Sequence, residues 1–446
     1  MIKKFIYGIL ILLLGLLVLL IACVAPIDYT AYQEQAYYRA SLQAMDSLEK
    51  VLPPLKGDTV EAGWSKKNIT PTQPAKLMGY GWKGEYERVH DSLKVHTVVF
   101  TNGVQSVAVL SYDLMIVHPD LAKAIHLAVE EADLPLRNIY FSAVHTHNGF
   151  GEWAEGVGGL LTAGGYDDEL VQYVARQSVA SIEEALHKRR PVKIGYAEFE
   201  VPALVKNRLI KEGEVDDKLR VIKLTQDSGK TALLCTYSAH ATFLNSKRMD
   251  LSADYPSALR QYLEADSTVA FASFAAGAVG SHSAVREGEF SYEKMEAYAR
   301  QLATPLLNGL GSIIGEYTTQ LLYVEAPLYM GEPQLKLISG WRVRPWLYHA
   351  VLGEHKPYLS GLRLGEINML GVPADYSGML YQKLNKHDYP LVVSSFNGNY
   401  MGYVIPDEYY KQAHREAREL NWYGPYTGSY VTEMMNRLNH ILIKAD

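Results

Sequence analysis

The sequence predicts a layered α/β domain with a mixed β-sheet and flanking helices, preceded by one N-terminal membrane segment. Three observations favour this fold. Short apolar runs of strand composition alternate with helical patterns, two turn motifs indicate β-hairpins, and a single long uncharged stretch stands at the N-terminus. The chain has 446 residues, 48% of them hydrophobic and 21% charged, which is enough apolar material for one large core.

The N-terminal segment, residues 1–25, contains an uncharged run that begins at Phe5, behind Lys3 and Lys4. As a helix, this run is long enough to cross ~30 Å of hydrocarbon, and the preceding lysines place its N-terminus in the cytoplasm. Leu-Ile-Ala-Cys, ending at Cys23, is also typical of a lipoprotein processing site, and a cleaved secretory signal is a third interpretation. All three put the remaining chain outside the cytoplasm, in the periplasm or at the cell surface.

The later elements follow from periodicity and turn residues. Residues 26–60 predict a stalk or first helix, and residues 61–446 predict one domain. Asn-Gly at 102–103 and Asp-Ser-Gly-Lys at 227–230 each predict a hairpin. The remaining patterns predict helices over 119–134, 168–186, 255–264 and 292–307, strands over 138–144, 192–201 and 269–274, and a glycine-rich loop over 149–165.

Charge and cysteine content exclude several classes of protein. The formal net charge is -6 and no block of Lys and Arg follows the N-terminus, so nucleic acid is not expected as a partner. The chain has two cysteines, Cys23 and Cys235, which rules out a disulfide framework. Cys235 lies in an apolar run and is expected to be a buried strand residue. The oligomeric state stays open.

Two histidine motifs directly follow predicted strands. His145 and His147 come after the strand at 138–144, and two imidazoles at i and i+2 point to the same side of an extended chain. His240 follows the second strand of the second hairpin. Because ligand sites gather at the carboxyl ends of strands in α/β sheets, these motifs are expected to meet. The alternative for each is a hydrogen-bonded histidine of the core or of a loop.

A carboxylate, Asp375, also follows an apolar run and precedes a predicted helix. Two histidines and one carboxylate with one open position are the ligands of a hydrolytic zinc (Zn2+) site, so His145, His240 and Asp375 are candidate metal ligands. The alternative for Asp375 is a helix cap, a position that aspartate favours.

The sequence resembles the neutral/alkaline (non-lysosomal) ceramidase family, N-terminal catalytic domain, over about residues 70 to 430. The resemblance rests on motifs that stand in the family's order: Val-His-Thr-His-Asn-Gly (144–149), Asn-Arg (207–208), Tyr-Ser-Ala-His-Ala-Thr (237–242), Val-Gly-Ser-His-Ser (279–283), Pro-Ala-Asp (373–375), Asn-Gly-Asn-Tyr-Met-Gly-Tyr-Val (397–404) and Tyr-Gly-Pro (423–425). Together they are more specific than any one of them.

This resemblance implies a zinc site formed by His145, His240 and Asp375, with Tyr403 beside the metal. It also implies catalytic roles for four residues. Arg208 and Tyr403 would stabilise a developing oxyanion, and His147 would move a proton to the leaving amine. Ser283 stands at the position of the family's important serine.

The sequence departs from the family's pattern at several positions. Asp375 replaces a glutamate, Ser281 an aspartate and Ala284 a proline, which leaves the role of Ser283 open. A family tyrosine is expected near His414, where the alignment is loose. The chain ending at Asp446 leaves little room for the family's additional C-terminal β domain.

The function expected from the resemblance is zinc-dependent hydrolysis of the amide bond of an N-acyl lipid, ceramide or a related N-acyl sphingoid base, by an enzyme tethered to a membrane. One alternative is an amidase or esterase acting on another acylated substrate. A serine esterase using Ser283 with His282 or His240 is a further possibility, although the Gly-x-Ser-x-Gly turn of such enzymes is missing. A surface lipoprotein that binds lipid without catalysis belongs to a different class and predicts no stoichiometric zinc.

Overall fold

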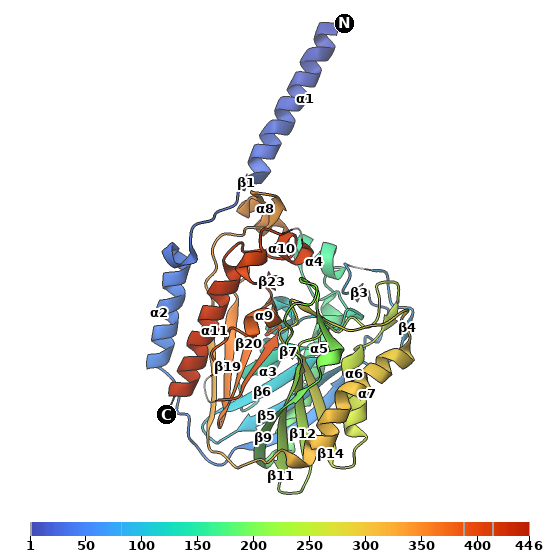
Figure 1. The fold of residues 1–446 in the computed structure, drawn as a ribbon, viewed down its shortest axis with the longest axis vertical. Helices are drawn as coiled ribbons and strands as arrows, with labels where there is room; N and C mark the ends of the chain where they lie inside the picture. The colour runs from blue at the N-terminus through green and yellow to red at the C-terminus, as the bar shows by residue number, and fades with distance from the viewer. Residues whose placement is uncertain (1, 82, 387–388, 413, 446) are drawn as a thin grey trace.

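The protein is described by a computed structural model, which places residues 2–81, 83–386, 389–412 and 414–445. The first element is α1 (Ile2–Cys23), which projects from the rest of the molecule (Figure 1). Among the helices of the described residues, none combines the length and the apolarity needed to cross a membrane. The membrane segment expected over residues 1–25 is thus unconfirmed.

The large sheet has eight strands and is mixed, as predicted. Its order is β14-β12-β11-β9-β2-β5-β6-β7, and only the pairs β12–β14 and β6–β7 are parallel among the neighbours in this order. The strands are β14 (Val269–Ala276), β12 (Thr231–Tyr237), β11 (Lys218–Gln226), β9 (Arg190–Glu200), β2 (Glu61–Asn68), β5 (Lys94–Thr101), β6 (Ser106–Tyr112) and β7 (Asn138–Ala143).

A second sheet of four strands packs against the first. Its order is β16 (Leu321–Pro327), β19 (Tyr358–Leu364), β20 (Ile367–Val372) and β22 (Leu391–Ser395). Apolar side chains of both sheets, among them Phe100, Tyr140, Leu362 and Val392, form one buried cluster. The facing sheets therefore enclose a core from which water is excluded.

Helices cover the outer face of each sheet, so the molecule has four layers (Figure 1). The large sheet packs with α3 (Pro119–Glu131), α5 (Asp168–His187), α6 (Tyr255–Glu264) and α7 (Tyr292–Gly309). The small sheet packs with α2 (Ala36–Lys50) and α11 (Thr427–Lys444). Apolar residues at helical spacing, such as Leu121 and Ile125 of α3, face the sheet.

Both predicted hairpins are confirmed: β5 pairs with β6 around Asn102-Gly103, and β11 pairs with β12 around 227–230. Gly103 has a φ of 78°, a left-handed conformation that glycine adopts without strain, within a four-residue loop between Thr101 and Ser106. The helix predicted to run to residue 134 ends earlier, at Glu131. Cys235 is buried on β12, as expected. β14 also contacts β6 and β7, so the sheet curls and the segments that follow β7 and β12 meet, where the His147 N–H donates to the carbonyl of Ala241 at 3.4 Å.

Candidate active site

His145 and His240 leave the large sheet at the ends of two strands. His145 follows β7 after one residue, and its backbone N–H bonds to the carbonyl of Leu114 at 3.0 Å. Its φ is 64°, so the chain turns there through a left-handed conformation that non-glycine residues rarely adopt. The extended geometry predicted for the two imidazoles of His-Thr-His is therefore wrong. The turn nevertheless brings Nε2 of His147 within 3.3 Å of Nε2 of His145.

The outer nitrogens of His145 and His240 are tied to backbone carbonyls. Nδ1 of His145 lies 2.8 Å from the carbonyl oxygen of Met115, and Nδ1 of His240 lies 2.9 Å from that of Val279. Because a carbonyl only accepts, both Nδ1 atoms carry the proton, and each Nε2 presents a bare lone pair. Metal-binding histidines are oriented by the same kind of hydrogen bond.

Asp375 faces both lone pairs. Its Oδ1 lies 3.1 Å from Nε2 of His145 and 3.3 Å from Nε2 of His240. The other oxygen, Oδ2, accepts a hydrogen bond of 2.7 Å from the hydroxyl of Tyr400, whereas Oδ1 has no hydrogen-bond partner among the described residues although it is buried. Asp375 lies on β21 (Asp375–Tyr376), and the cap of the following helix α9 (Gly378–Tyr381) is Ser377, so Asp375 is not a helix cap.

Three lone-pair donors in contact repel one another unless a cation lies between them. Ligands about 2.0–2.1 Å from a tetrahedral zinc ion are separated by roughly 3.3 Å, which is the spacing that links Asp375 to the two imidazoles. His145, His147 and His240 also form a group that could hold a metal ion, since their nitrogens lie within 4.8 Å of one another. The donors present, imidazole and carboxylate, fit a hydrolytic zinc site.

Burial sets the protonation states that a metal site needs. Burial, together with the positive charge of Arg208, lowers the pKa of His240 to about 3, and burial next to the two other histidines holds the pKa of His147 well below its usual value. Burial raises the pKa of Asp375, whereas a proton carried on Nε2 of His145 or His240 would lower it well below its usual range. Neutral imidazoles beside a carboxylate are the ligand forms that bind a metal at neutral pH.

Tyr403 and Arg208 complete the centre. β23 (Tyr403–Val404) pairs in parallel with β21, opposite Asp375, and this pairing brings the Tyr403 hydroxyl within 3.1 Å of Nε2 of His240. Nη2 of Arg208 donates to the same hydroxyl at 2.8 Å and to the carbonyl of Gly280 at 3.1 Å. Burial raises the pKa of Tyr403, so the group is a neutral phenol beside a fixed positive charge.

Ser283 and His282 adjoin His240 through the backbone: the His282 carbonyl lies 3.0 Å from Nδ1 of His240, and Ser283 forms a β-bridge with His240. Ser283 lies on β15 (His282–Ala284), opposite Lys206 on β10 (Val205–Asn207), and no hydrogen bond within the described residues joins its hydroxyl to the histidines. His282 is buried with Nδ1 bonded to the Ser281 hydroxyl and Nε2 accepting from the backbone N–H of Asp216. Since both ring nitrogens are occupied, His282 is not placed to activate a serine.

Four contact residues were not assigned a role from the sequence. Tyr400 bonds to Asp375, Phe396 stacks on the His145 ring at 4.2 Å, Tyr80 lies 4.9 Å from the His147 ring, and Glu416 pairs with Arg208 at 3.3 Å. Phe396 comes directly after the buried strand β22, and His145 and His240 come within three residues of the ends of β7 and β12. A position just after a buried strand is therefore the sequence signal that could have identified Phe396. Tyr80 and Glu416 carry no comparable local signal.

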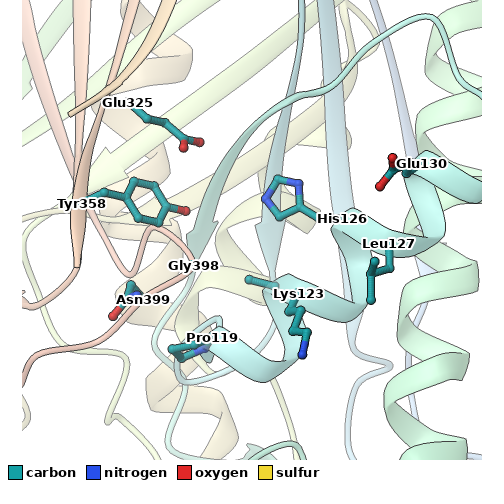
Figure 2. Close-up of a pocket in the computed structure, with 10 residues that line it drawn as sticks. Pro119, Lys123, His126, Leu127, Glu130, Glu325, Tyr358, Gly398 and Asn399 are labelled. Atoms are coloured by element: carbon teal, nitrogen blue, oxygen red, sulfur yellow. The ribbon is translucent and has the colours of Figure 1, made fainter. Parts of the chain in front are cut away.

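A surface cavity of about 360 Å3 lies behind the loop that carries Tyr400. Its lining includes His126 of α3 and Tyr358 of β19, which point toward each other across the opening (Figure 2). Gly398 and Asn399 close it on the loop side, and the Tyr358 hydroxyl donates to the carbonyl of Asn397 at 2.6 Å. The lining contains none of the candidate ligands, so this cavity is separate from the histidine centre.

Comparison with solved structures identifies the fold. The chain is similar to a crystal structure of neutral ceramidase from Pseudomonas aeruginosa, with a TM-score of 0.72 and 16% identity, covering 88% of this chain and 75% of that one. A structure described as a ceramidase complexed with C2 gives the same values. No curated protein matches the chain.

The sequence itself matches the family described as neutral/alkaline non-lysosomal ceramidase, N-terminal, over residues 61–304. This match spans more than half of the 446 residues and includes His145, His147, Arg208 and His240. The chain therefore belongs to the neutral/alkaline non-lysosomal ceramidase family.

Proposed function

We propose that the protein is a zinc-dependent amidase that hydrolyses the amide bond of an N-acyl lipid, ceramide or a related N-acyl sphingoid base, to a fatty acid and a free amine. The observation that supports this most is the convergence of His145 Nε2, His240 Nε2 and the unpartnered Asp375 Oδ1 at 3.1 and 3.3 Å. Family membership supports the amide of ceramide as the bond that is cleaved.

His145, His240 and Asp375 would hold the zinc ion, with the Tyr403 hydroxyl beside it. When bound there, zinc supplies a Lewis acid that lowers the pKa of a water molecule to near neutrality. Tyr400 orients the carboxylate by its hydrogen bond to Oδ2, and Phe396 supports the His145 ring from one face. The ligands are thus held in position before substrate arrives.

Arg208 and Tyr403 would bind the amide carbonyl oxygen as negative charge develops on it. The Arg208 guanidinium is fixed by Glu416 and by the carbonyl of Gly280, so its charge and the Tyr403 hydroxyl are oriented in advance. His147 is neutral, since burial lowers its pKa, and its Nε2 faces the same centre. It is the candidate for transferring a proton to the leaving amine nitrogen.

A membrane location is part of the proposal. Lys3 and Lys4 before the apolar run support an N-terminal anchor with the catalytic domain outside the cytoplasm. A lipidated Cys23 would give the same placement. An N-acyl lipid partitions into membranes, so an enzyme held at a membrane has its substrate close by.

The test is an assay of the purified full chain on ceramide, on the matching N-acyl amino acid and on the matching fatty ester, presented in the same micelles. Cleavage of ceramide that stops on chelation and returns with one equivalent of zinc supports the proposal. Fastest cleavage of the ester with no effect of the chelator would contradict it. If another amide is preferred but chelation still stops the reaction, the mechanism stands and the substrate assignment fails.

A further inference from the structure

The base of α1 is fastened to one end of the catalytic domain. Directly after α1, β1 (Val24–Pro26) pairs antiparallel with β18 (Trp341–Val343), which itself pairs with β17 (Lys336–Ile338). The next helix, α8 (Pro345–Leu352), begins beside this pair. Arg344 donates to the carbonyl of Val24 at 3.1 Å, and the Trp346 indole donates to that of Ala22 at 2.7 Å. The projecting helix therefore has a defined attachment (Figure 1).

Exposed apolar side chains gather around this attachment. They come from the β17–β18 hairpin, from α8 and from α4 (Gly156–Ala163), which packs against α8. Each is 45% exposed or more, and we name them the apolar rim: Val157, Leu160, Leu161, Ile338, Trp341 and Trp346. The described apolar side chains of α1, such as Phe5 and Ile11 at 71%, are exposed as well. Soluble surfaces rarely group this many large apolar residues, so a partner is expected.

The apolar rim lies at the same end of the molecule as the histidine centre. On α8, Tyr348 contacts the ring of Trp422, with centroids 6.0 Å apart, and Trp422 contacts Tyr400 at 5.2 Å. Tyr400 in turn donates to Asp375. α4 follows His147 along the chain, because its first residue, Gly156, comes nine positions after His147. One aromatic side chain, Trp422, thus lies between α8 and Tyr400, the residue that bonds to the candidate metal carboxylate.

We propose that the apolar rim and the base of α1 dock on a lipid bilayer, so that an acyl-chain substrate enters the site from the lipid without crossing water. The identity of that substrate rests on the proposed function. Tryptophans beside a projecting apolar helix are typical of the membrane interface, where an indole meets both apolar and polar surroundings. A second copy of the chain fits the apolar rim poorly as a partner. In a two-fold contact between two rims, the α1 helix that projects from each rim (Figure 1) would run into the other copy.

The experiment uses the full chain in phosphatidylcholine vesicles whose acyl chains carry bromine, which quenches nearby indoles. Wild-type tryptophan emission is expected to fall on transfer from unbrominated to brominated vesicles. The double variant W341F/W346F should lose most of that quenching. The matched control, Trp64→Phe, should retain it, because Trp64 is buried between the two sheets. Absence of quenching in the wild type, or full quenching in the double variant, would overturn the proposal.

A second readout separates docking from chemistry. The variant L161S/I338S should lower the rate on a long-chain N-acyl lipid in vesicles about tenfold, because docking loses apolar contact, and should leave the rate on a short soluble N-acyl amide unchanged. The control variant V104S/I314S removes two residues that are 52% and 77% exposed outside the rim, and neither rate should change. Equal losses on both substrates would contradict docking. If quenching is seen but neither substrate is cleaved, the proposed function fails and the docking surface stands.

Discussion

The Tyr400 hydroxyl donates a hydrogen bond of 2.7 Å to Oδ2 of Asp375 and thereby leaves Oδ1 facing His145 and His240. An aspartate has a shorter side chain than the glutamate of the family's pattern. The parallel pairing of β21 with β23 carries the Asp375 backbone toward the centre, and Tyr400 fixes the rotation of its carboxylate. The contact would thus allow an aspartate to act as the proposed carboxylate ligand at this position.

Tyr400→Phe should lower kcat/KM and zinc affinity by about 10- to 100-fold, the usual effect of losing a group that orients a metal ligand. The free carboxylate would rotate away from its ligating position. The measurements are steady-state kinetics and a zinc titration against a competing chelator. Tyr381→Phe is the matched control, because its buried hydroxyl donates to the carbonyl of Leu391 away from the centre. This control should lower the free energy of unfolding by about 1 kcal/mol and leave the zinc affinity unchanged.

His240→Ala should abolish stoichiometric zinc binding and activity while the domain stays folded. The side chain supplies one of the three converging donors, and a site with two protein ligands holds zinc weakly. Elemental analysis of the purified variant measures its zinc content, and its circular dichroism spectrum shows whether the domain is folded. A folded variant with full zinc occupancy would show that His240 is not a ligand.

Asp375→Asn tests the carboxylate separately from its hydrogen bond. Asparagine keeps the shape and can still accept from Tyr400, but its neutral amide is a poor zinc ligand. Zinc affinity and activity should therefore fall steeply. Thermal stability in the presence of a chelator should change much less, because Ser377 rather than Asp375 caps α9. Retained zinc together with retained activity would contradict the assignment.

His96 should make the protein sensitive to acid. Burial and the nearby Arg260 lower its pKa to about 4, and both ring nitrogens lack hydrogen-bond partners among the described residues. In the unfolded chain its pKa is about 6.5, so the unfolded state takes up a proton first as the pH falls. The free energy of unfolding should therefore decrease from about pH 6.5 down to about pH 4.

His96→Gln should make this decrease shallower, as measured by urea denaturation at a series of pH values. His187→Gln is the control, because His187 is exposed at the end of α5 and its replacement should leave the pH profile parallel to that of the wild type. Identical profiles for the wild type and His96→Gln would exclude His96 as the source of acid sensitivity.

The sequence by itself determined the local structure and the candidate ligands. Asn102-Gly103 indicated a hairpin because glycine there permits the left-handed backbone that a turn uses, and the apolar runs before His145 and His240 indicated strands that end just before these histidines. These are properties of short segments, so they are readable without knowing what the segments contact. The motif order was also sufficient to indicate the family.

Only the tertiary structure decided how distant segments complete the centre. The pairing of β21 with β23, the left-handed turn at His145 and the contacts of Tyr400, Tyr80 and Glu416 depend on how the two sheets and their loops pack together. The same packing buries His282, whose ring nitrogens bond to Ser281 and Asp216 while its carbonyl lies against Nδ1 of His240. Side chains far apart in sequence meet only after the core has formed, so a local sequence pattern does not predict which of them will be in contact.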